Sequence, residues 1–511
     1  MGSGAGSYRF DGERLVGRRR LDSPHSVLTV YPNSGALAMA NLGFLKIMRL
    51  AEAVEGWHAE RAFAGMQRSW ERKRTFSSFD LIAFSLSYEL DYLAVPRILA
   101  EGRIPPAAAD RDDRHPPVVA GGAAVTINPR ALAGIVDLAV SGEGEGVLER
   151  LLKRLEELRG RSRREKLAAL SELPGVVSPS SGPGSWTPPA DPWEAGADYR
   201  IVAGGSVFPG RGLIEVGRGC ARGCRFCSAG YIYRPARYRS PESVLAEARR
   251  YGEATRALGL VSPSVSDHPR IGPIARALRD EGFSLSVSSL RAETAAPDLL
   301  EILAESGQKE IALAPEAGSP RLRRAINKPI PDEIFLEAAR SASRAGMQYL
   351  KIYFMVGLPG ETAEDLDEAL ALARRLREII PLRATTAPFV PRPGTPFQYA
   401  AMETPAALKR KTAHLAAGFR RIKGVEVRGF SVRQSIAQCA LGFGGPETLD
   451  LLRRGRLPEA ARISGVHDPA ARAYPAGRLS SRWLRDEWEK AGKGESTPPC
   501  AFGTCRACGA C

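Results

Sequence analysis

The chain has 511 residues, of which 44% are hydrophobic and 25% charged, a balance typical of folded globular proteins. No stretch approaches the ~18 uninterrupted apolar residues of a membrane span, and the first residues lack the apolar core of a signal peptide, so we expect a cytoplasmic protein of two or three domains with no membrane partner. The net charge of +15 is compatible with RNA as a partner, but an arginine-rich surface also follows from genomic base composition.

Residues 1–22 are predicted to be a disordered lead-in, because the first seven are mostly glycine and serine. From 23 to 177, strand-like and helix-like segments alternate. The predicted strands are 27–31, 81–86, 118–122 and 137–140, and the predicted helices are 37–53, 91–99 (despite Pro96) and 146–158. Alternation with apolar strands favours an α/β domain built on a doubly wound parallel sheet with both faces covered.

Two glycine-rich loops follow predicted strands in this domain. Gly121 and Gly122 end one strand, and the run 141–146 reads Ser-Gly-Glu-Gly-Glu-Gly after another. Ligands of doubly wound sheets sit at the carboxyl ends of the strands, where glycine lets a backbone approach a ligand. Tight turns with helix caps explain the same glycines, so both interpretations stay open.

A segment rich in serine, glycine and proline, 178–205, is predicted to be a linker. Strand–helix alternation then resumes over 206–400. Predicted strands are 213–216, 258–264, 283–287, 310–314, 350–356 and 384–389, with helices such as 241–258, 332–345 and 363–379. Six such units fit a partial (β/α)6 barrel, whose chemistry lies at the carboxyl ends of the strands. Residues 401–511 form a mixed C-terminal extension.

Three cysteines stand together just after the first barrel strand, at Cys220, Cys224 and Cys227. Thiolates at this spacing can hold one [4Fe–4S] cube and leave its fourth iron open. A zinc site or incidental cysteines are the alternatives, although structural zinc generally takes four protein ligands and no fourth lies close by in sequence.

This C-x3-C-x2-C pattern resembles the signature of the radical S-adenosylmethionine superfamily, and the barrel position agrees with it. The resemblance implies that S-adenosylmethionine binds the open iron and is split by one electron to a 5′-deoxyadenosyl radical. It also implies contacts to this cofactor from Phe226 beside the adenine, from Glu316 at the ribose or amino group, and from Ser289, Arg291 and Lys328 near the methionine part. Ion pairs or caps explain the last four equally well. His268 faces the substrate or, more simply, is a capping or surface histidine.

Several blocks of the first domain resemble the cobalamin-binding-type domain of class B radical S-adenosylmethionine proteins. They are the segments at Tyr31, Asn41, Phe84, Ala120 and Gly142. The whole chain from about 27 to 511 is similar to an uncharacterised family of such proteins with a cysteine-rich end. The usual corrinoid motif supplies a histidine to cobalt, and none of His25, His58 and His115 has that setting. Cobalamin without a histidine ligand, and a domain that has lost cobalamin, are both left open.

Four further cysteines close the chain, at Cys500, Cys505, Cys508 and Cys511. Four thiolates within so short a segment indicate a metal site: a second iron–sulfur cluster is favoured, zinc is the main competitor, and corrinoid-binding or redox thiols are a third option. Cys439 stands alone and is expected to be a buried hydrophobe.

The predicted function is that of a radical S-adenosylmethionine enzyme that modifies an unreactive carbon, with cobalamin-dependent methyl transfer as one form of it. The substrate is RNA, a ribosomal protein or a small molecule, and a flavodoxin- or ferredoxin-like partner supplies electrons. No particular residue is predicted to be catalytic. A methylthiolating enzyme would need three cysteines in the first domain, and none precedes Cys220. The alternative from another class is a metal-dependent RNA-binding or assembly factor without radical chemistry.

Overall fold

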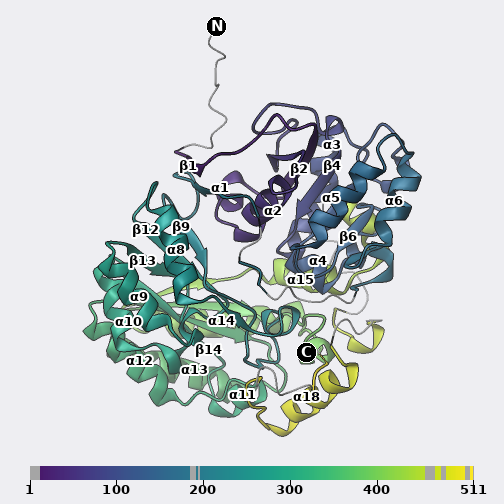
Figure 1. Cartoon of the computed structure of the whole chain (residues 1–511). Helices are drawn as coiled ribbons and strands as arrows, with labels where there is room; N and C mark the ends of the chain where they lie inside the picture. Colours follow the sequence, from purple (N-terminus) through teal and green to yellow (C-terminus); the bar gives the residue numbers. More distant parts are fainter. Residues whose placement is uncertain are drawn as a thin grey trace. The chain divides into compact units, whose positions relative to one another are not determined.

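The structure, a computed structural model, describes residues 12–184, 191–193, 196–454, 466–472, 479–500 and 507–509. The chain divides into two compact units (Figure 1). The first comprises Met1–Gly212, Glu253–Thr255 and Leu441–Ile463, and the second comprises Leu213–Gly252, Arg256–Ala440 and Ser464–Cys511. Each unit is described by itself.

The first unit is built on a six-stranded sheet in the order β3-β2-β4-β5-β6-β7. Its strands are β2 (His25–Tyr31), β3 (Trp57–Phe63), β4 (Leu81–Ser85), β5 (Val118–Gly121), β6 (Leu138–Val140) and β7 (Val176–Val177). All neighbours pair in parallel except β6 and β7. The chain runs from β2 to β3 on one side and then returns to β4 on the other. The predicted doubly wound α/β fold is therefore confirmed, with its topological switch point between β2 and β4.

Amphipathic helices cover this sheet. The helices are α1 (Gly35–Ala38), α2 (Leu42–Glu52), α3 (Val95–Glu101), α4 (Ala123–Ile127), α5 (Val147–Glu157), α6 (Arg163–Ser171) and α16 (Leu449–Arg454). In α5, the buried residues Val147, Leu148, Leu151, Leu152 and Leu155 recur at helical spacing, so one face packs into the core shared with α2 and the sheet. Pro96 lies in the first turn of α3, where a missing backbone N–H costs nothing.

Two predicted boundaries of this unit need correction. Residues Arg14–Gly17 form β1, which pairs antiparallel with β8 (Tyr199–Val202), so the expected lead-in over 1–22 and linker over 178–205 both contain ordered strands. A buried ion network holds the β1 segment in place. Glu13 lies 2.7 Å from the Arg61 guanidinium, and Arg19 lies 2.7 Å from Glu52 and 3.0 Å from Glu71.

The second unit contains two sheets, a three-stranded one in the order β13-β12-β9 and a four-stranded one in the order β14-β15-β16-β17. The strands are β9 (Gly212–Glu215), β12 (Ala257–Val261), β13 (Ser284–Val287), β14 (Glu310–Glu316), β15 (Tyr349–Val356), β16 (Leu382–Pro388) and β17 (Val425–Gly429). The Gln308 side chain links the sheets, because it accepts from the Val287 N–H and donates to the Glu310 carbonyl. The described strands form no closed ring, in keeping with the predicted partial barrel.

Helices alternate with these strands. They are α7 (Ala229–Ile232), α8 (Pro241–Tyr251), α9 (Ile271–Asp280), α10 (Pro297–Glu305), α11 (Pro320–Ala325), α12 (Asp332–Arg344), α13 (Ala363–Arg377), α14 (Pro405–Arg420), α15 (Val432–Phe443) and α18 (Ser481–Lys493), with the short strands β10 (Gly217–Arg218) and β11 (Arg237–Tyr238). The barrel was predicted to end at residue 400, but β17 pairs with β16 beyond that point, so this boundary was set too early.

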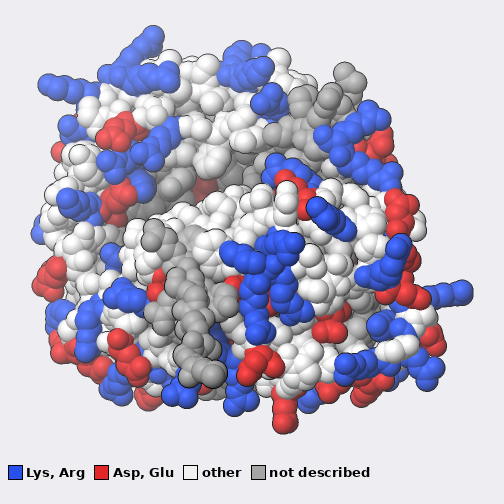
Figure 2. Space-filling model, turned by 90° about the horizontal axis from the view of Figure 1, so that it is seen from above, with Lys and Arg blue, Asp and Glu red and all other residues white. Residues whose placement is uncertain are grey.

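On the face shown in Figure 2, lysine and arginine alternate with acidic residues and do not merge into one continuous basic surface. Within the described part of the chain, no helix is both long and apolar enough to cross a membrane.

Candidate functional site

The three cysteines of the first group lie in one loop that follows β9 and β10. Gly219 opens the loop with φ 76°, and a Cβ there would stand 2.2 Å from the Tyr233 carbonyl oxygen. Only glycine fits this position without a shift of the backbone. Within the loop, the Cys227 N–H donates to the Cys224 carbonyl at 3.1 Å, and the Arg222 N–H donates to the Cys220 thiol at 3.4 Å.

The thiols of this loop influence one another electrostatically. Burial raises the pKa of Cys220 to about 11, and the charges of Cys224 and Cys227 add to the rise. Burial likewise raises the pKa of Cys227, with Cys224 as the next cause. A thiolate is the form that binds iron, and a cationic cluster stabilises it, so three thiols grouped in one loop fit an iron–sulfur cube.

A site for a single metal ion is the alternative for this loop. Among the described residues, no three His, Cys, Asp or Glu side chains gather closely enough to hold one metal ion. An iron–sulfur cube takes each thiolate at a different corner. The choice between a cluster and zinc at Cys220, Cys224 and Cys227 therefore stays a prediction.

One side of the loop is held by an acidic residue from the turn after β12. Arg222 pairs with Asp267 at 3.0 Å, and Asp267 also accepts from the Thr294 hydroxyl at 3.3 Å. Arg291 lies 3.9 Å from the same carboxylate. Burial lowers the pKa of Arg291, but the negative charges of Glu293 and Cys224 outweigh it and the pKa is raised. The predicted cofactor residue Arg291 is therefore within electrostatic reach of the cysteine loop.

Glu316 and Lys328 approach the loop from another side. Glu316 ends β14 at a register shift with φ 68°, a backbone conformation that costs a non-glycine residue about 1–2 kcal/mol. Such outliers persist where surrounding structure enforces them, often at functional sites. Lys328 Nζ lies 3.3 Å from Glu316 Oε1, and the Glu316 charge contributes to the raised pKa of Cys227.

The remaining cofactor residues predicted from the sequence differ in their surroundings. Phe226 packs against a buried cluster that includes Leu358 and Phe389. Ser289 is exposed in the loop after β13. His268 is 3% exposed and accepts from the Arg270 N–H at 3.0 Å, while its Nε2 lies 2.9 Å from the Arg239 carbonyl, so it is a buried capping histidine.

The second cysteine group is only partly within the described residues. The Cys500 N–H donates to the Ala221 carbonyl at 2.7 Å, which places Cys500 beside the first cysteine loop. Cys508 is 4% exposed and packs in a small apolar cluster. Cys505 and Cys511 lie outside the described residues, so the predicted four-cysteine metal site stays a prediction.

The sequence blocks singled out in the first unit meet at one edge of its sheet. Tyr31, Ser85, Gly121 and Val140 end β2, β4, β5 and β6, which run parallel and therefore share their carboxyl edge. Gly122 follows with φ 116°, and a Cβ there would lie 2.4 Å from the Leu86 carbonyl oxygen. This is the edge at which doubly wound sheets bind ligands.

Polar side chains gather at this edge between β2 and β4. The Asn41 amide donates to the Tyr31 hydroxyl at 3.4 Å and to the Ser87 hydroxyl at 3.2 Å. Asp91 is 8% exposed. Burial raises the pKa of Asp91 to about 6, opposed by a hydrogen bond from Asn33 and assisted by the charge of Glu89. The switch point therefore has polar groups but no histidine among them.

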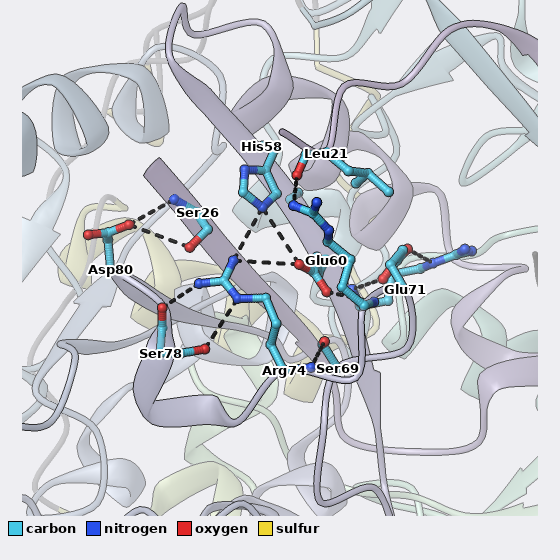
Figure 3. A network of polar contacts seen from close by, with 12 residues as sticks. Leu21, Ser26, His58, Glu60, Ser69, Glu71, Arg74, Ser78 and Asp80 are labelled. Atoms are coloured by element: carbon cyan, nitrogen blue, oxygen red, sulfur yellow. Dashed lines mark hydrogen bonds and ion pairs between the residues drawn. The ribbon is translucent and has the colours of Figure 1, made fainter. Parts of the chain in front are cut away.

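The histidines of the first unit lie at the opposite edge. His25 begins β2 and stacks on Trp57 with ring centroids 5.0 Å apart, His58 is the second residue of β3, and His115 precedes β5. In Figure 3, His58 faces Arg74 and Glu60, with Nε2 at 3.4 Å from Arg74 Nη1 and 3.6 Å from Glu60 Oε1. None of the three is placed to bind a cofactor at the carboxyl edge.

Sequence reasoning missed the residues that support the cysteine loop. Arg222 and Asp267 are one such pair, and the fully buried Arg225 with Glu487 is another. The only local signal is an arginine between two cysteines, because the partners lie 45 and 262 residues away.

Comparisons with known proteins agree with this geometry. Residues 47–179 match the family model of radical SAM proteins, N-terminal, and residues 214–373 match the model of the radical SAM superfamily. An uncharacterised protein of Methanocaldococcus jannaschii is 29% identical over 82% of this chain and 88% of its own length. A tRNA-2-methylthio-N(6)-dimethylallyladenosine synthase of Desulfitobacterium hafniense is 27% identical over 39% of this chain, which spans 47% of that relative.

The fold resembles a solved structure over both units. The radical S-adenosylmethionine methyltransferase TsrM from Kitasatospora setae, with cobalamin and a [4Fe–4S] cluster bound, superposes with a TM-score of 0.51 at 17% identity and covers 71% of this chain and 72% of its own. At this identity the likeness concerns the fold alone. The two radical SAM family matches, together with the three-cysteine loop after the first barrel strand, show that the chain belongs to the radical S-adenosylmethionine superfamily.

Proposed function

We propose that the protein is an enzyme that binds a [4Fe–4S] cluster at Cys220, Cys224 and Cys227 and cleaves S-adenosylmethionine to modify an unreactive carbon. The observation that carries the proposal is the grouping of these three thiols in one loop, within electrostatic reach of Arg291 and Glu316. When bound, the cluster supplies the electron that splits the carbon–sulfur bond of S-adenosylmethionine. The chain's own task is to orient that molecule and to exclude water.

The residues around the loop suit the parts of S-adenosylmethionine. Glu316 and Lys328 form a partly buried ion pair that offers both an acceptor and a donor to the ribose or the amino acid end. The Arg291 guanidinium suits the carboxylate, and Phe226 offers an aromatic surface for adenine. Ser289 is exposed in the adjoining loop and completes the proposed set.

We also propose that the first unit binds cobalamin at the carboxyl edge of its sheet, with no imidazole from the chain at cobalt. The polar switch point between β2 and β4 supports binding at this edge. The positions of His25, His58 and His115 at the opposite edge support the absence of a histidine ligand.

Methyl transfer is the reaction we favour, with RNA, a ribosomal protein or a small molecule as substrate. The methyltransferase named in the comparison has a similar fold, and the net charge of +15 favours a polyanion. A methylthiolating reaction is suggested by the tRNA-modifying relative. It is the weaker candidate because no cysteine of this chain precedes Cys220.

The C-terminal cysteines are proposed to hold a second metal centre, an iron–sulfur cluster in preference to zinc. The hydrogen bond from Cys500 to Ala221 supports a position beside the first loop. A flavodoxin- or ferredoxin-like protein would supply electrons. We propose a cytoplasmic location because iron–sulfur ligands are kept reduced in that compartment.

The decisive experiment is anaerobic reconstitution with iron and sulfide, followed by S-adenosylmethionine and dithionite. We expect 5′-deoxyadenosine by mass spectrometry from the wild-type protein, none from Cys224→Ala, and normal yield from Cys439→Ala, which removes a buried thiol outside both cysteine groups. Absence of product from a loaded wild-type protein, even after addition of RNA and cell extract, would contradict the proposal. RNA affinity without cofactor cleavage would favour the binding-factor alternative.

A further inference from the structure

A buried arginine stands inside the cysteine motif. Arg225, between Cys224 and Phe226, has no exposed surface. Its guanidinium donates to Glu487 Oε2 at 3.1 and 3.3 Å and to the carbonyls of Ala325 and Glu495, each at 2.9 Å. A buried guanidinium is stable only when its charge and N–H groups are matched in this way. The motif therefore depends on partners from distant parts of the chain.

The charge partner comes from the C-terminal helix α18. Glu487 is 1% exposed and also accepts from Lys490 Nζ at 2.8 Å and from the Thr497 hydroxyl at 2.7 Å. Burial alone would raise the pKa of Glu487, but the hydrogen bonds from Lys490 and Thr497 and the Arg225 charge lower it. The carboxylate is thus held ionised and in one position.

The same C-terminal segment contacts the loop at two further points. The Asn327 amide donates to the Gly223 carbonyl at 3.0 Å and to the Thr497 carbonyl at 3.1 Å, and it accepts from the Thr497 N–H at 2.8 Å. The Cys500 N–H donates to the Ala221 carbonyl at 2.7 Å. Residues 221, 223 and 225, which alternate along the loop between the cysteines, are therefore all bound to this segment directly or through Asn327.

Aromatic packing holds the C-terminal helix α18 against residues near the cysteine loop. Trp488 of α18 meets Phe397 edge to face at 5.7 Å, in the same apolar cluster as Phe226. The ring centroid of Trp483 lies 5.9 Å from that of Tyr231, and the Tyr231 hydroxyl donates to the Gly223 carbonyl at 3.0 Å. Large aromatic contacts of this kind contribute most of the packing energy of a docked helix.

We propose that residues 479–500 are a positioning element of the cysteine loop, and that Glu487 acts through Arg225 as its positioning residue. The inference rests on the proposed function, in which this loop holds the cluster. Glu487 has two effects on the loop. It fixes the Arg225 backbone between two ligands, and it neutralises a cation that would otherwise favour the extra electron of the reduced cluster.

The test compares Glu487→Gln, Arg225→Gln and the double variant with Glu489→Gln, which removes an exposed carboxylate from the same helix. In redox titrations followed by electron paramagnetic resonance, we expect a more positive potential for Glu487→Gln and a more negative one for Arg225→Gln. The potential of the double variant should return toward that of the wild type, and the potential of the Glu489→Gln control should equal that of the wild type. The expected single shifts are about tenfold in the ratio of reduced to oxidised cluster, or about 59 mV for one electron. A purely structural role would not give opposite signs.

A second measurement uses the cluster-free chain and so does not depend on loading. Iodoacetamide labelling of Cys220, Cys224 and Cys227, read by mass spectrometry, should be several-fold faster in Glu487→Gln than in Glu489→Gln. Equal labelling rates would overturn the positioning role, and an unshifted potential with faster labelling would overturn the electrostatic effect. If the wild type forms no cluster, the proposed function fails, while the labelling comparison still decides whether the segment positions the loop.

Discussion

Replacing Gly219 by alanine tests whether the cysteine loop needs its observed backbone. The left-handed φ of 76° costs an alanine about 1–2 kcal/mol. The new Cβ would also stand 2.2 Å from the Tyr233 carbonyl oxygen, whereas ordinary van der Waals contact begins at 3.4 Å. The obstacle is backbone, which cannot rotate away, so the loop that begins here must move by about 1 Å, more than a preorganised site tolerates.

Gly282→Ala is the matched control for this prediction. Gly282 has φ 81° in the same unit, and a Cβ there would meet nothing within 4 Å. Both variants should lose about 1–2 kcal/mol of unfolding free energy through backbone strain. Only Gly219→Ala should also lose cluster affinity, by about 10- to 100-fold, the usual effect of disturbing residues that orient metal ligands. Iron and sulfide per chain after anaerobic reconstitution give the readout. Equal cluster content in the two variants would refute the reasoning.

Three other outcomes follow from the first unit. Glu71→Gln should lower the free energy of unfolding, measured with denaturant, by about 3–5 kcal/mol, because Glu71 is 1% exposed and its loss leaves the charges of Arg61 and Arg19 partly uncompensated. The control Glu157→Gln changes an exposed carboxylate and should lower it by less than about 0.5 kcal/mol. Equal losses in the two variants would contradict a stabilising role for the ion network. The pKa of Asp91 is about 6 in the folded chain and about 3.9 in the unfolded chain, so ionisation of this carboxyl lowers the free energy of unfolding above pH 6, and the loss disappears as the pH falls to 4. Asp91→Asn should therefore be more stable than the wild type at pH 7.5 and equal to it at pH 4. A difference that stays constant with pH would show that the carboxyl is not buried in this way. If cobalamin binds, the variants His25→Ala, His58→Ala and His115→Ala should each retain it, and the cobalt(II) resonance of the wild type should show no splitting by a nitrogen of the chain. Loss of cobalamin in one variant, or a splitting in the wild type that disappears in one variant, would identify a histidine ligand.

The elements that the sequence predicted best are those with one clear period. The apolar strands predicted in both units and the helix at Val147–Glu157 agree with the structure because burial and spacing agree there. Strand β3 was missed because Glu60 and Arg61 lie in its middle. Both are fully buried, and their charges are matched by residues from elsewhere: Arg74 lies 3.5 Å from Glu60, and Glu13 lies 2.7 Å from Arg61. A strand stabilised by distant partners has no local pattern that reveals it.

The candidate site shows the same division between local and distant causes. The spacing of the three cysteines is local, so the sequence alone predicts them as cluster ligands, and the glycine that shapes the loop stands beside them. The conformation of the loop depends on Asp267, Asn327, Glu487 and the Cys500 backbone, which lie 45 to 279 residues from the loop positions they bind. The interactions that hold the cysteine loop are therefore long-range contacts that close large loops of chain. In a shortened chain, contacts to the missing residues cannot form. A fragment that stops at the end of the predicted barrel, residue 400, would keep every ligand of the first cysteine group and lose the carboxylate that neutralises Arg225. The superfamily motif identifies where a cluster can bind, while the C-terminal segment determines whether the loop is held in a form that can receive it.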